Sequence, residues 1–254
     1  MAGRFFMLNA VASKNKLKEI AKLQQKKYRD ESGLFIAEGA KILEEMLSVN
    51  FDILEIFSLY EFHNDKITCP VYIVDETGMK KISSTDSVCE LLVVAKKKKV
   101  HIENFVKLNK LILLDSVSDP GNLGTIIRSA SAFGVDGIIL YGNCTDLYSS
   151  KVIRSTAGNF FKIPVISINS IEEIQKYFKN HVKIATALSE NNNISLNECA
   201  KINKRIIMFG AEANGLNTDL IKSADKNIKL EMQNGVESLN LAVCASIIMY
   251  ELSV

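Results

Sequence analysis

The sequence lacks the residue patterns that identify disulfide-bonded and metal-binding proteins. It contains no tryptophan and three prolines in 254 residues. Its five cysteines, at positions 69, 89, 144, 199 and 244, include no CxxC pair, which favours reduced thiols in a cytoplasmic protein over disulfides or zinc ligands. The three histidines are far apart in the sequence and match no metal motif. We therefore expect no metal site.

Long hydrophobic runs are also missing. No apolar run reaches the length of a membrane span, and residues 1–16 contain no apolar core of the kind found in secretory leaders. We therefore expect neither a membrane span nor a secretory leader. The net charge of +2 does not by itself indicate a nucleic-acid partner. A hydrophobic fraction of 47% is ample for a core, and the length suits one large domain or two small ones.

Positive charge is nevertheless concentrated in two places. Residues 13–29 have the apolar stripe of one helix, and lysines and Arg29 occupy its other face. That face suits a phosphate backbone, although a solvated helix surface explains it equally well. The run Lys96–Lys99 resists burial, so we place a domain boundary within residues 96–110. Such a run is usually a solvated linker, but it could also touch RNA.

Residues 111–141 predict a strand–loop–helix–strand unit. Leu111–Leu114 is a short apolar run typical of a buried strand, and turn-forming residues follow it. Asn122 and Gly124 should precede the helix, with Arg128 inside it. An amide and a guanidinium at the carboxyl end of such a strand suit a phosphate-bearing ligand. In the simpler alternative, Asn122 caps the helix and Arg128 pairs with a surface carboxylate.

A strand followed by a polar, glycine-containing loop occurs twice more. One case is the strand Ile206–Phe209 with the loop Gly210–Leu216, and the other is a short strand near residue 228 with a loop to Asn240. The helix expected over residues 241–252 is apolar almost all round, so we expect it to be buried, partly against a second subunit. Glu212 is equally explained as a first-turn helix acid, and Ser238 as an N-cap.

Taken together, these loops resemble a known family. Asn122-x-Gly124-x-x-x-Arg128, Phe209–Leu216 and Glu237–Val243 are similar, in order and spacing, to three motifs of the SpoU (TrmH) family. Members of this family are RNA ribose 2′-O-methyltransferases of the SPOUT class, which use S-adenosylmethionine. Residues 151–158 also resemble the family. The N-terminal part resembles, less specifically, a small substrate-binding domain, through Asn15, Arg29 and Phe35–Gly39.

The resemblance implies an α/β fold with two parts. The C-terminal part would be a SPOUT trefoil-knotted open parallel sheet with helices on both faces, and the N-terminal part a small α/β domain like a ribosomal protein. The implied division is an RNA substrate-binding domain at 1–98, a linker at 99–109 and a methyltransferase domain at 110–254. The resemblance also implies a homodimer formed through the knotted domain, in the cytoplasm.

The resemblance further implies roles for individual residues. Arg128 would clamp a phosphate and stabilise the alkoxide, because a guanidinium stays protonated at neutral pH and is therefore a poor base. The expected catalytic set is Arg128, Asn122, Glu212, Ser238 and Asn240. The expected donor-binding set is Thr186, Ala187, Leu188, Gly210, Glu212, Gly215, Leu230, Met232 and Leu239. The expected RNA contacts are Lys14, Asn15, Lys26, Lys27, Arg29 and Arg154.

The resemblance has two departures, and two other functions compete with it. Glu231 stands where family members often have proline, which places a carboxylate beside the donor pocket. In Asn234-Gly235 the glycine is shifted by one place from its usual position in the family. A Rossmann-type NAD enzyme would need a G-x-G-x-x-G motif that is missing here. A non-catalytic RNA-binding protein on the same fold is disfavoured by the intact motifs. Large-subunit ribosomal RNA is expected as substrate over tRNA, by family analogy.

Overall fold

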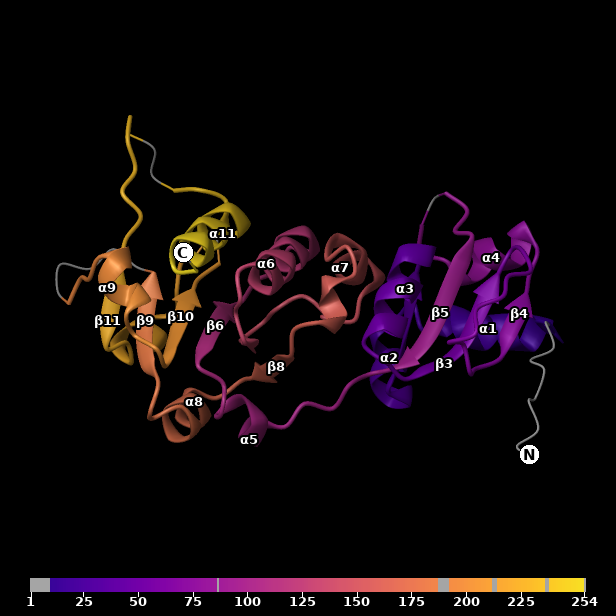
Figure 1. Ribbon diagram of the computed structural model, residues 1–254, viewed down its shortest axis with the longest axis horizontal. Coiled ribbons are helices and arrows are strands. Elements are labelled where there is room, and N and C mark those ends of the chain that lie inside the picture. The colour runs from indigo at the N-terminus through magenta and orange to yellow at the C-terminus, as the bar shows by residue number, and fades with distance from the viewer. Residues whose placement is uncertain (1–9, 86, 187–191, 212–213, 236–237, 254) are drawn as a thin grey trace. The chain divides into compact units, whose positions relative to one another are not determined.

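The chain folds into two compact units. The computed structural model describes residues 10–85, 87–186, 192–211, 214–235 and 238–253. Unit 1 contains the chain up to Lys98 together with Asp146–Phe161, and unit 2 contains Lys99–Thr145 and the chain from Lys162 onward (Figure 1). The segment Asp146–Phe161, which lies between two strands of unit 2 in the sequence, thus packs with unit 1. The domain limits expected from the sequence stay a prediction.

Unit 1 is built on a mixed five-stranded sheet in the order β1-β4-β3-β5-β2. Strand β5 is antiparallel to both β2 and β3, whereas β4 runs parallel to β3 and β1. The strands are β1 (Ala10–Val11), β2 (Leu34–Glu38), β3 (Ile53–Ser58), β4 (Val71–Ile73) and β5 (Leu91–Lys96). The helices are α1 (Lys14–Lys22), α2 (Lys26–Ser32), α3 (Ala40–Ser48), α4 (Glu76–Ile82) and α7 (Ser150–Ser155), with the 3-10 turn η1 (Asn159–Phe161).

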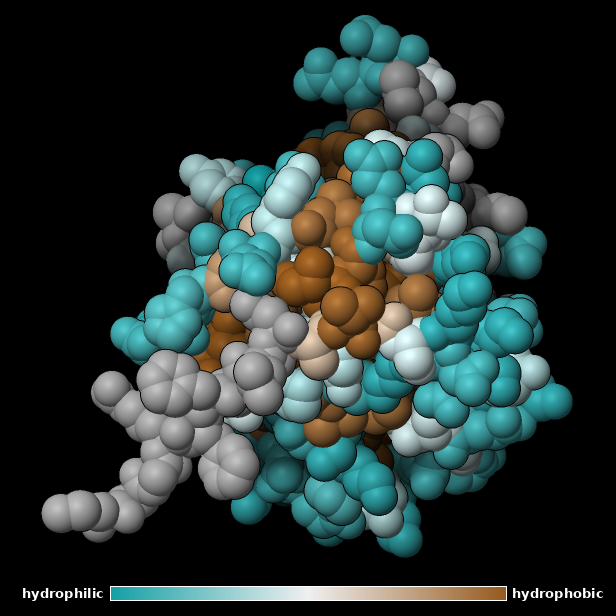
Figure 2. Space-filling model, turned by 90° about the vertical axis from the view of Figure 1, so that its right-hand side faces the viewer, coloured by the Kyte–Doolittle hydropathy of each residue, from teal (hydrophilic) through white to brown (hydrophobic). Residues whose placement is uncertain are grey.

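Both faces of this sheet are covered, because alternate residues of each strand point to opposite sides. Phe35 of β2 and Val93 of β5 face α3, α7 and η1. Ile36 and Leu92 face α1 and α4. Viewed from the end where β4 lies, unit 1 is largely hydrophilic around a central hydrophobic area (Figure 2).

The basic segment 13–29 is not the single helix expected. Helix α1 ends at Lys22 and α2 begins at Lys26. The intervening turn carries backbone hydrogen bonds from Leu23, Gln24 and Gln25 to residues of α1. This break turns Arg29 out of the basic face and into the protein, where 4% of it is exposed.

Unit 2 is built on a six-stranded sheet in the order β11-β9-β10-β6-β7-β8, in which every pair is parallel. Its strands are β6 (Lys110–Asp115), β7 (Gly137–Tyr141), β8 (Val165–Ile168), β9 (Val182–Thr186), β10 (Arg205–Phe209) and β11 (Lys226–Ile228). Its helices are α5 (Ile102–Phe105), α6 (Pro120–Ala132), α8 (Ile171–Tyr177), α9 (Leu196–Ala200), α10 (Thr218–Lys222) and α11 (Leu241–Glu251).

Helices lie on both faces of this sheet, as expected for an α/β fold with buried parallel strands. Helices α5, α8 and α10 share one hydrophobic cluster with Leu111 and Met208. Helices α6 and α11 contact each other on the opposite face (Figure 1). Their C-terminal ends lie beside Ile112 and Ile207.

Helices α6 and α11 run side by side in the same direction. Three pairs join them along their length: Asn122 with Asn240, Ser129 with Ser246, and Phe133 with Tyr250. The Ser129 and Ser246 hydroxyls are 2.7 Å apart, and the Phe133 and Tyr250 ring centroids are 5.6 Å apart. Two segments more than a hundred residues apart are therefore held in a fixed register.

Helix α6 begins earlier than the sequence suggested. Asp119 is its N-cap, because its side chain accepts a hydrogen bond of 2.7 Å from the Asn122 backbone N–H, and Pro120 occupies the first turn. Asn122 and Gly124 consequently lie inside the helix and not before it. Asn122 is thus not the helix cap that the simpler alternative required.

Candidate active site

The candidate site lies at the carboxyl edge of the unit 2 sheet. Because β11, β9, β10 and β6 are parallel neighbours, their carboxyl ends meet at one edge. Thr186 ends β9, Gly210 follows β10 and Asp115 ends β6. The Thr186 hydroxyl donates a hydrogen bond of 2.9 Å to the Met208 carbonyl. This edge is where open α/β sheets usually bind ligands.

Gly210 marks the tightest point of this edge. A Cβ at this position would lie 2.1 Å from the backbone carbon of Gly215 and from the backbone nitrogen of Leu216. The loop folds back because the Gly215 N–H donates to the Ala211 carbonyl at 2.8 Å, with Gly215 in the left-handed region at φ 65°. Only glycine fits at position 210 without displacing this loop.

Asp115 holds the same loop from the neighbouring strand, a role that the sequence analysis did not assign. Its carboxylate is 4% exposed and accepts hydrogen bonds from the Asn217 backbone N–H at 2.7 Å and from the Ser116 hydroxyl at 2.8 Å. The available signal was an acidic residue directly after a buried apolar strand. A carboxylate in that position is costly to bury unless it is hydrogen-bonded, so it indicates a structural partner.

Two of the expected catalytic residues are in contact. The Asn240 side-chain N–H donates to the Asn122 side-chain oxygen at 3.1 Å. Asn240 also caps α11, since its side-chain oxygen accepts from the backbone N–H groups of Ala242 at 3.0 Å and Val243 at 3.3 Å. The amide of Asn240 therefore has a fixed orientation, and it fixes Asn122 in turn. The first and third sequence motifs meet at this pair.

A pocket of about 420 Å³ opens beside the pair. Its size is within the usual range for small-molecule sites. Its wall combines apolar surface with hydroxyl, amide and carboxylate groups, and it is formed by Ser116, Val117, Ser118, Asp119, Asn122, Asn143, Ala211, Asn214 and Leu241. The pocket thus brings together residues from the loops after β6, β7 and β10 and from the start of α11.

Arg128 lies outside this pocket. It is exposed on α6, six residues after Asn122 and so about 9 Å further along the helix axis. Among the residues that the structure describes, it has no hydrogen-bond or ion-pair partner. The structure therefore does not place its guanidinium against the Asn122–Asn240 pair within one chain. The side chain is long and exposed, so its guanidinium is accessible to a phosphate from solution.

The remaining residues of the expected donor-binding and catalytic sets differ in their exposure. Leu230 and Met232, half-buried, come shortly after β11, and Ser238 and Leu239 are exposed just before α11. Glu231 is exposed, so its carboxylate remains solvated. Ala187, Leu188 and Glu212 lie outside the described residues.

Four of the expected RNA contacts are exposed on unit 1. Lys14 and Asn15 lie in the first turn of α1, and Lys26 and Lys27 lie in the first turn of α2. The Lys27 ammonium also lies 5.8 Å from the ring centroid of Tyr28. These side chains form the polar surface that the basic segment predicted.

Arg29 has a structural role instead. Its guanidinium donates to the Leu23 carbonyl at 2.7 Å, to the Gln24 carbonyl at 2.8 Å and, through Nε, to Asp146 at 3.1 Å. These contacts satisfy the charge inside unit 1 and secure the turn between α1 and α2. The expectation that Arg29 binds RNA therefore needs correction, because its charged group is buried and already paired.

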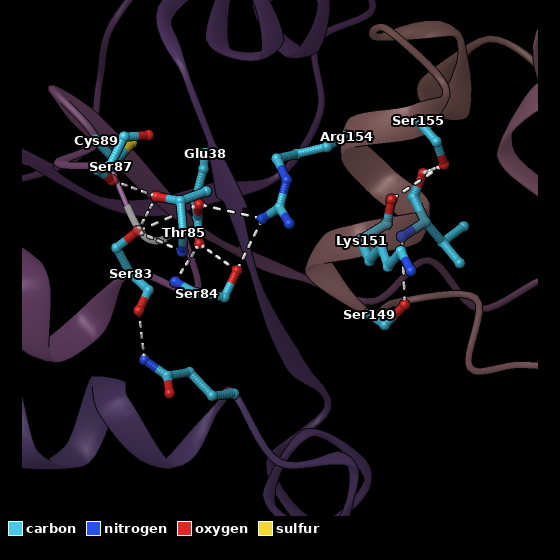
Figure 3. Close-up of polar contacts among 12 residues, drawn as sticks. Glu38, Ser83, Ser84, Thr85, Ser87, Cys89, Ser149, Lys151, Arg154 and Ser155 are labelled. Carbon is cyan, nitrogen blue, oxygen red and sulfur yellow. Dashed lines mark hydrogen bonds and ion pairs between the residues drawn. The ribbon is translucent and has the colours of Figure 1, made fainter. Parts of the chain in front are cut away.

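Arg154 points from α7 toward a buried carboxylate (Figure 3). Its Nη1 lies 3.3 Å from Glu38 and 2.8 Å from the Ser84 hydroxyl. Glu38, whose side chain is 2% exposed, also accepts from the backbone N–H and the hydroxyl of Ser84, each at 2.8 Å. Arg154 thus supports a loop of unit 1, with 35% of its side chain exposed.

The described part of the chain has neither a metal-binding cluster nor a membrane-spanning helix, and its thiols are unpaired. No group of histidine, cysteine, aspartate and glutamate side chains in the described chain could hold a metal ion. Within the same residues, no helix is long and apolar enough to cross a membrane. All five cysteines are free, and burial raises the pKa of Cys69 and of Cys199 to about 11.

Comparison with known families gives two matches along the chain. Residues 109–250 match the SpoU rRNA Methylase family. Residues 14–92 match the MRM3-like substrate binding domain. The first match covers more than half of the chain and includes the carboxyl edge of the unit 2 sheet. The second covers the larger part of unit 1.

Individual relatives are similar along their whole length. A Bacillus subtilis protein named 23S rRNA (guanosine(2553)-2′-O)-methyltransferase RlmP is 30% identical, over 95% of this chain and 97% of its own. The crystal structure of an AdoMet-bound rRNA methyltransferase from Sinorhizobium meliloti has a TM-score of 0.85 at 29% identity, covering 96% of each chain. The SpoU methyltransferase AviRb from Streptomyces viridochromogenes, with AdoMet, shares the fold at a TM-score of 0.84 and 20% identity over 95% of this chain and 97% of its own.

Proposed function

The chain belongs to the SpoU rRNA Methylase family, and on this premise we propose that it transfers a methyl group from S-adenosylmethionine to a ribose 2′-hydroxyl of large-subunit ribosomal RNA. The observation that carries the proposal is the Asn240–Asn122 hydrogen bond of 3.1 Å at the carboxyl edge of the sheet. It joins two family motifs that are more than a hundred residues apart, beside a pocket of suitable size.

The residues at this edge fit the methyl donor. The backbone at Gly210 turns back so closely that a Cβ would overlap it, which leaves main-chain groups uncovered by side chains. Thr186 and the half-buried Leu230 and Met232 follow the neighbouring strands. The donor supplies an electrophilic methyl group on a sulfonium, which needs no metal. Gly210, Gly215, Leu230, Met232 and Leu239 are the described residues that we assign to holding it, together with Thr186.

The acceptor side depends on the two asparagines and Arg128. Methyl transfer is an in-line displacement, so the enzyme must align the ribose oxygen and stabilise the charge that develops on it. The fixed amides of Asn122 and Asn240 orient the ribose, and Arg128 binds the adjacent phosphate through its fork of N–H groups. Ser238, exposed before α11, supports the same site from the third motif.

Unit 1 supplies the RNA contacts in this proposal. Lys14, Asn15, Lys26 and Lys27 are exposed and can bind phosphates. Arg29 and Arg154 act indirectly, because each orders the surface through a carboxylate of unit 1. The division into a substrate-binding part and a methyltransferase part, with limits near residues 98 and 110, is included in the proposal.

Three further features of the family form part of the proposal: a trefoil knot, a homodimer and a cytoplasmic location. Support for the knot is that β10 pairs with β6 on the side opposite β7, so the chain returns past its own first strand in this sheet. Support for the dimer is an apolar stripe on α11, where Val243, Ile247 and Tyr250 are 47%, 38% and 54% exposed at helical spacing.

Transfer of radiolabelled methyl groups tests the substrate. The purified chain is incubated with labelled S-adenosylmethionine and, in parallel, with protein-free large-subunit rRNA or with tRNA from a strain that lacks the gene. Label in rRNA alone is the expected result. Label in tRNA alone would keep the chemistry and overturn the substrate. Donor binding with no label in either RNA would favour a non-catalytic RNA-binding role.

A further inference from the structure

The lysine run at residues 96–99 is not a loose linker along its length. The Lys96 N–H donates to the Asp52 carbonyl at 3.2 Å, and the Lys97 N–H donates to the Gly33 carbonyl at 2.8 Å. The Lys98 N–H donates to the Tyr148 hydroxyl at 3.1 Å. Three successive backbone groups are thereby fixed on unit 1. Holding adjacent like charges in one place is unfavourable for folding unless counter-charges or a bound anion offset the repulsion.

These lysines form one wall of a pocket that belongs to unit 1 alone. The pocket has a volume of about 360 Å³. Its other wall is apolar and aromatic, and the half-buried Phe51 ring meets Phe161 edge to face at 4.9 Å between centroids. The lining residues are Val49, Asn50, Phe51, Asp52, Lys96, Lys97, Lys98 and Phe161.

The three ammonium groups differ in their availability. Lys97 donates to Asp30 at 2.6 Å and lies 5.2 Å from the Tyr148 ring centroid, so it is fixed, and its hydrogen bond lowers the pKa of Asp30. Lys96 pairs with Asp52 at 3.2 Å, but both side chains are more than half exposed. Such an exposed pair contributes about 0–1 kcal/mol to folding stability, so Lys96 can readily leave Asp52 and bind another anion. Lys98 is exposed.

We propose that this pocket binds one unpaired nucleotide of the RNA substrate, with the base against Phe51 and a phosphate at Lys96 and Lys98. An aromatic wall beside a cationic rim matches a ligand that joins a flat ring to a phosphate. The pocket shares no residue with the α1–α2 contacts or with the methyl-transfer site. The proposal rests on the proposed function, because it presupposes that unit 1 binds RNA.

Binding of a fluorescein-labelled oligouridylate of about eight nucleotides tests the pocket, by anisotropy at several salt concentrations. The pocket variants are Lys96→Ala/Lys98→Ala and Phe51→Leu. The matched control is Lys80→Ala/Lys81→Ala, which removes the same charge from the exposed end of α4 on the same unit. Circular dichroism is used to check that Phe51→Leu folds normally. Lys96→Ala/Lys98→Ala changes only exposed side chains and should leave the hydrophobic core intact.

We expect at least tenfold weaker binding for Lys96→Ala/Lys98→Ala. The slope of log K against log salt concentration should be flatter by about 1.4, since two single-strand phosphate contacts are lost. Phe51→Leu should bind at least about fivefold more weakly, with an unchanged salt dependence. The control should bind within about twofold of the unaltered chain, on the premise that it touches no phosphate.

Four outcomes would overturn the proposal. If both pocket variants bind as the control does, the pocket takes no nucleotide. If unlabelled uridine monophosphate displaces the labelled oligonucleotide as well as the same concentration of unlabelled oligonucleotide does, the pocket binds a free nucleotide and not RNA. If the unaltered chain does not bind the oligonucleotide although it methylates rRNA, the pocket fails and the proposed function stands. If the unaltered chain neither binds the oligonucleotide nor transfers methyl groups to rRNA, the proposed function is refuted, and the pocket proposal with it.

Discussion

Substitution of Gly210 by alanine tests the donor site most sharply, because the structure gives the size of the conflict. The new Cβ would lie 2.1 Å from two backbone atoms of the loop, whereas ordinary contact begins at 3.4 Å. Neither atom belongs to a side chain that could rotate away, so the loop itself must move by about the difference between these two distances. Overpacking of this kind typically costs about 1–3 kcal/mol of folding stability.

The expected effect on the donor is larger than the effect on stability. A displaced loop no longer presents its main-chain groups to S-adenosylmethionine, so calorimetry should show at least about a hundredfold loss of affinity, or about 2.7 kcal/mol. Gly134→Ala is the control. It has open space around the Cβ position but φ of 70°, so it should cost roughly 1–2 kcal/mol of stability and leave donor affinity intact. Normal donor binding by Gly210→Ala would refute the assignment of this loop.

Three other predictions concern separate parts of unit 2. Arg128→Ala should bind S-adenosylmethionine within about twofold of normal yet lose at least about a hundredfold in methyl transfer; lost donor binding would contradict its role. Asn240→Ala removes the helix cap, so it should lose about 0.5–2 kcal/mol of stability, measured by urea unfolding, as well as methyl-transfer activity. Asn240→Asp keeps the oxygen that caps α11 but lacks the N–H that donates to Asn122, so it should lose activity alone. Burial lowers the pKa of His181 below 6.5, so the folded state favours the neutral ring. Stability should therefore be full above that pH and fall as the pH drops below it. Between about pH 7.5 and 5.5, His181→Gln should lose less folding stability than the unaltered chain does. Equal losses in the two proteins would show that His181 is not responsible.

The sequence predicted the strands of unit 2 well, and the reason is physical. A parallel strand that is covered on both faces must be apolar along its length, so runs such as Leu111–Leu114 and Ile206–Phe209 are conspicuous. Parallel strands also bring their carboxyl ends to one edge, which is why three distant loops were expected to form one site. The contact of Asn122 with Asn240 agrees with that reasoning.

The sequence did not predict where the long-range ion pairs would form. Arg29 looked like part of a basic face because its partner, Asp146, is 117 residues away and periodicity carries no information on such pairs. The same applies to Arg154 and Glu38, which are 116 residues apart. Local signals also placed the start of α6 too late, because Asp119 and Pro120 read equally well as a turn. The two errors over the ion pairs concern polar side chains whose roles depend on a distant segment, whereas the error at α6 is a local ambiguity.

Identification of the methylated nucleoside tests the central claim most directly. The labelled RNA product is digested to nucleosides and separated by liquid chromatography with mass spectrometry. The account predicts that all of the label migrates as a single 2′-O-methylated nucleoside, and that it disappears with Arg128→Ala. Label on a base, with an unmodified ribose, would contradict the assignment of Asn122, Asn240 and Arg128 to a ribose hydroxyl.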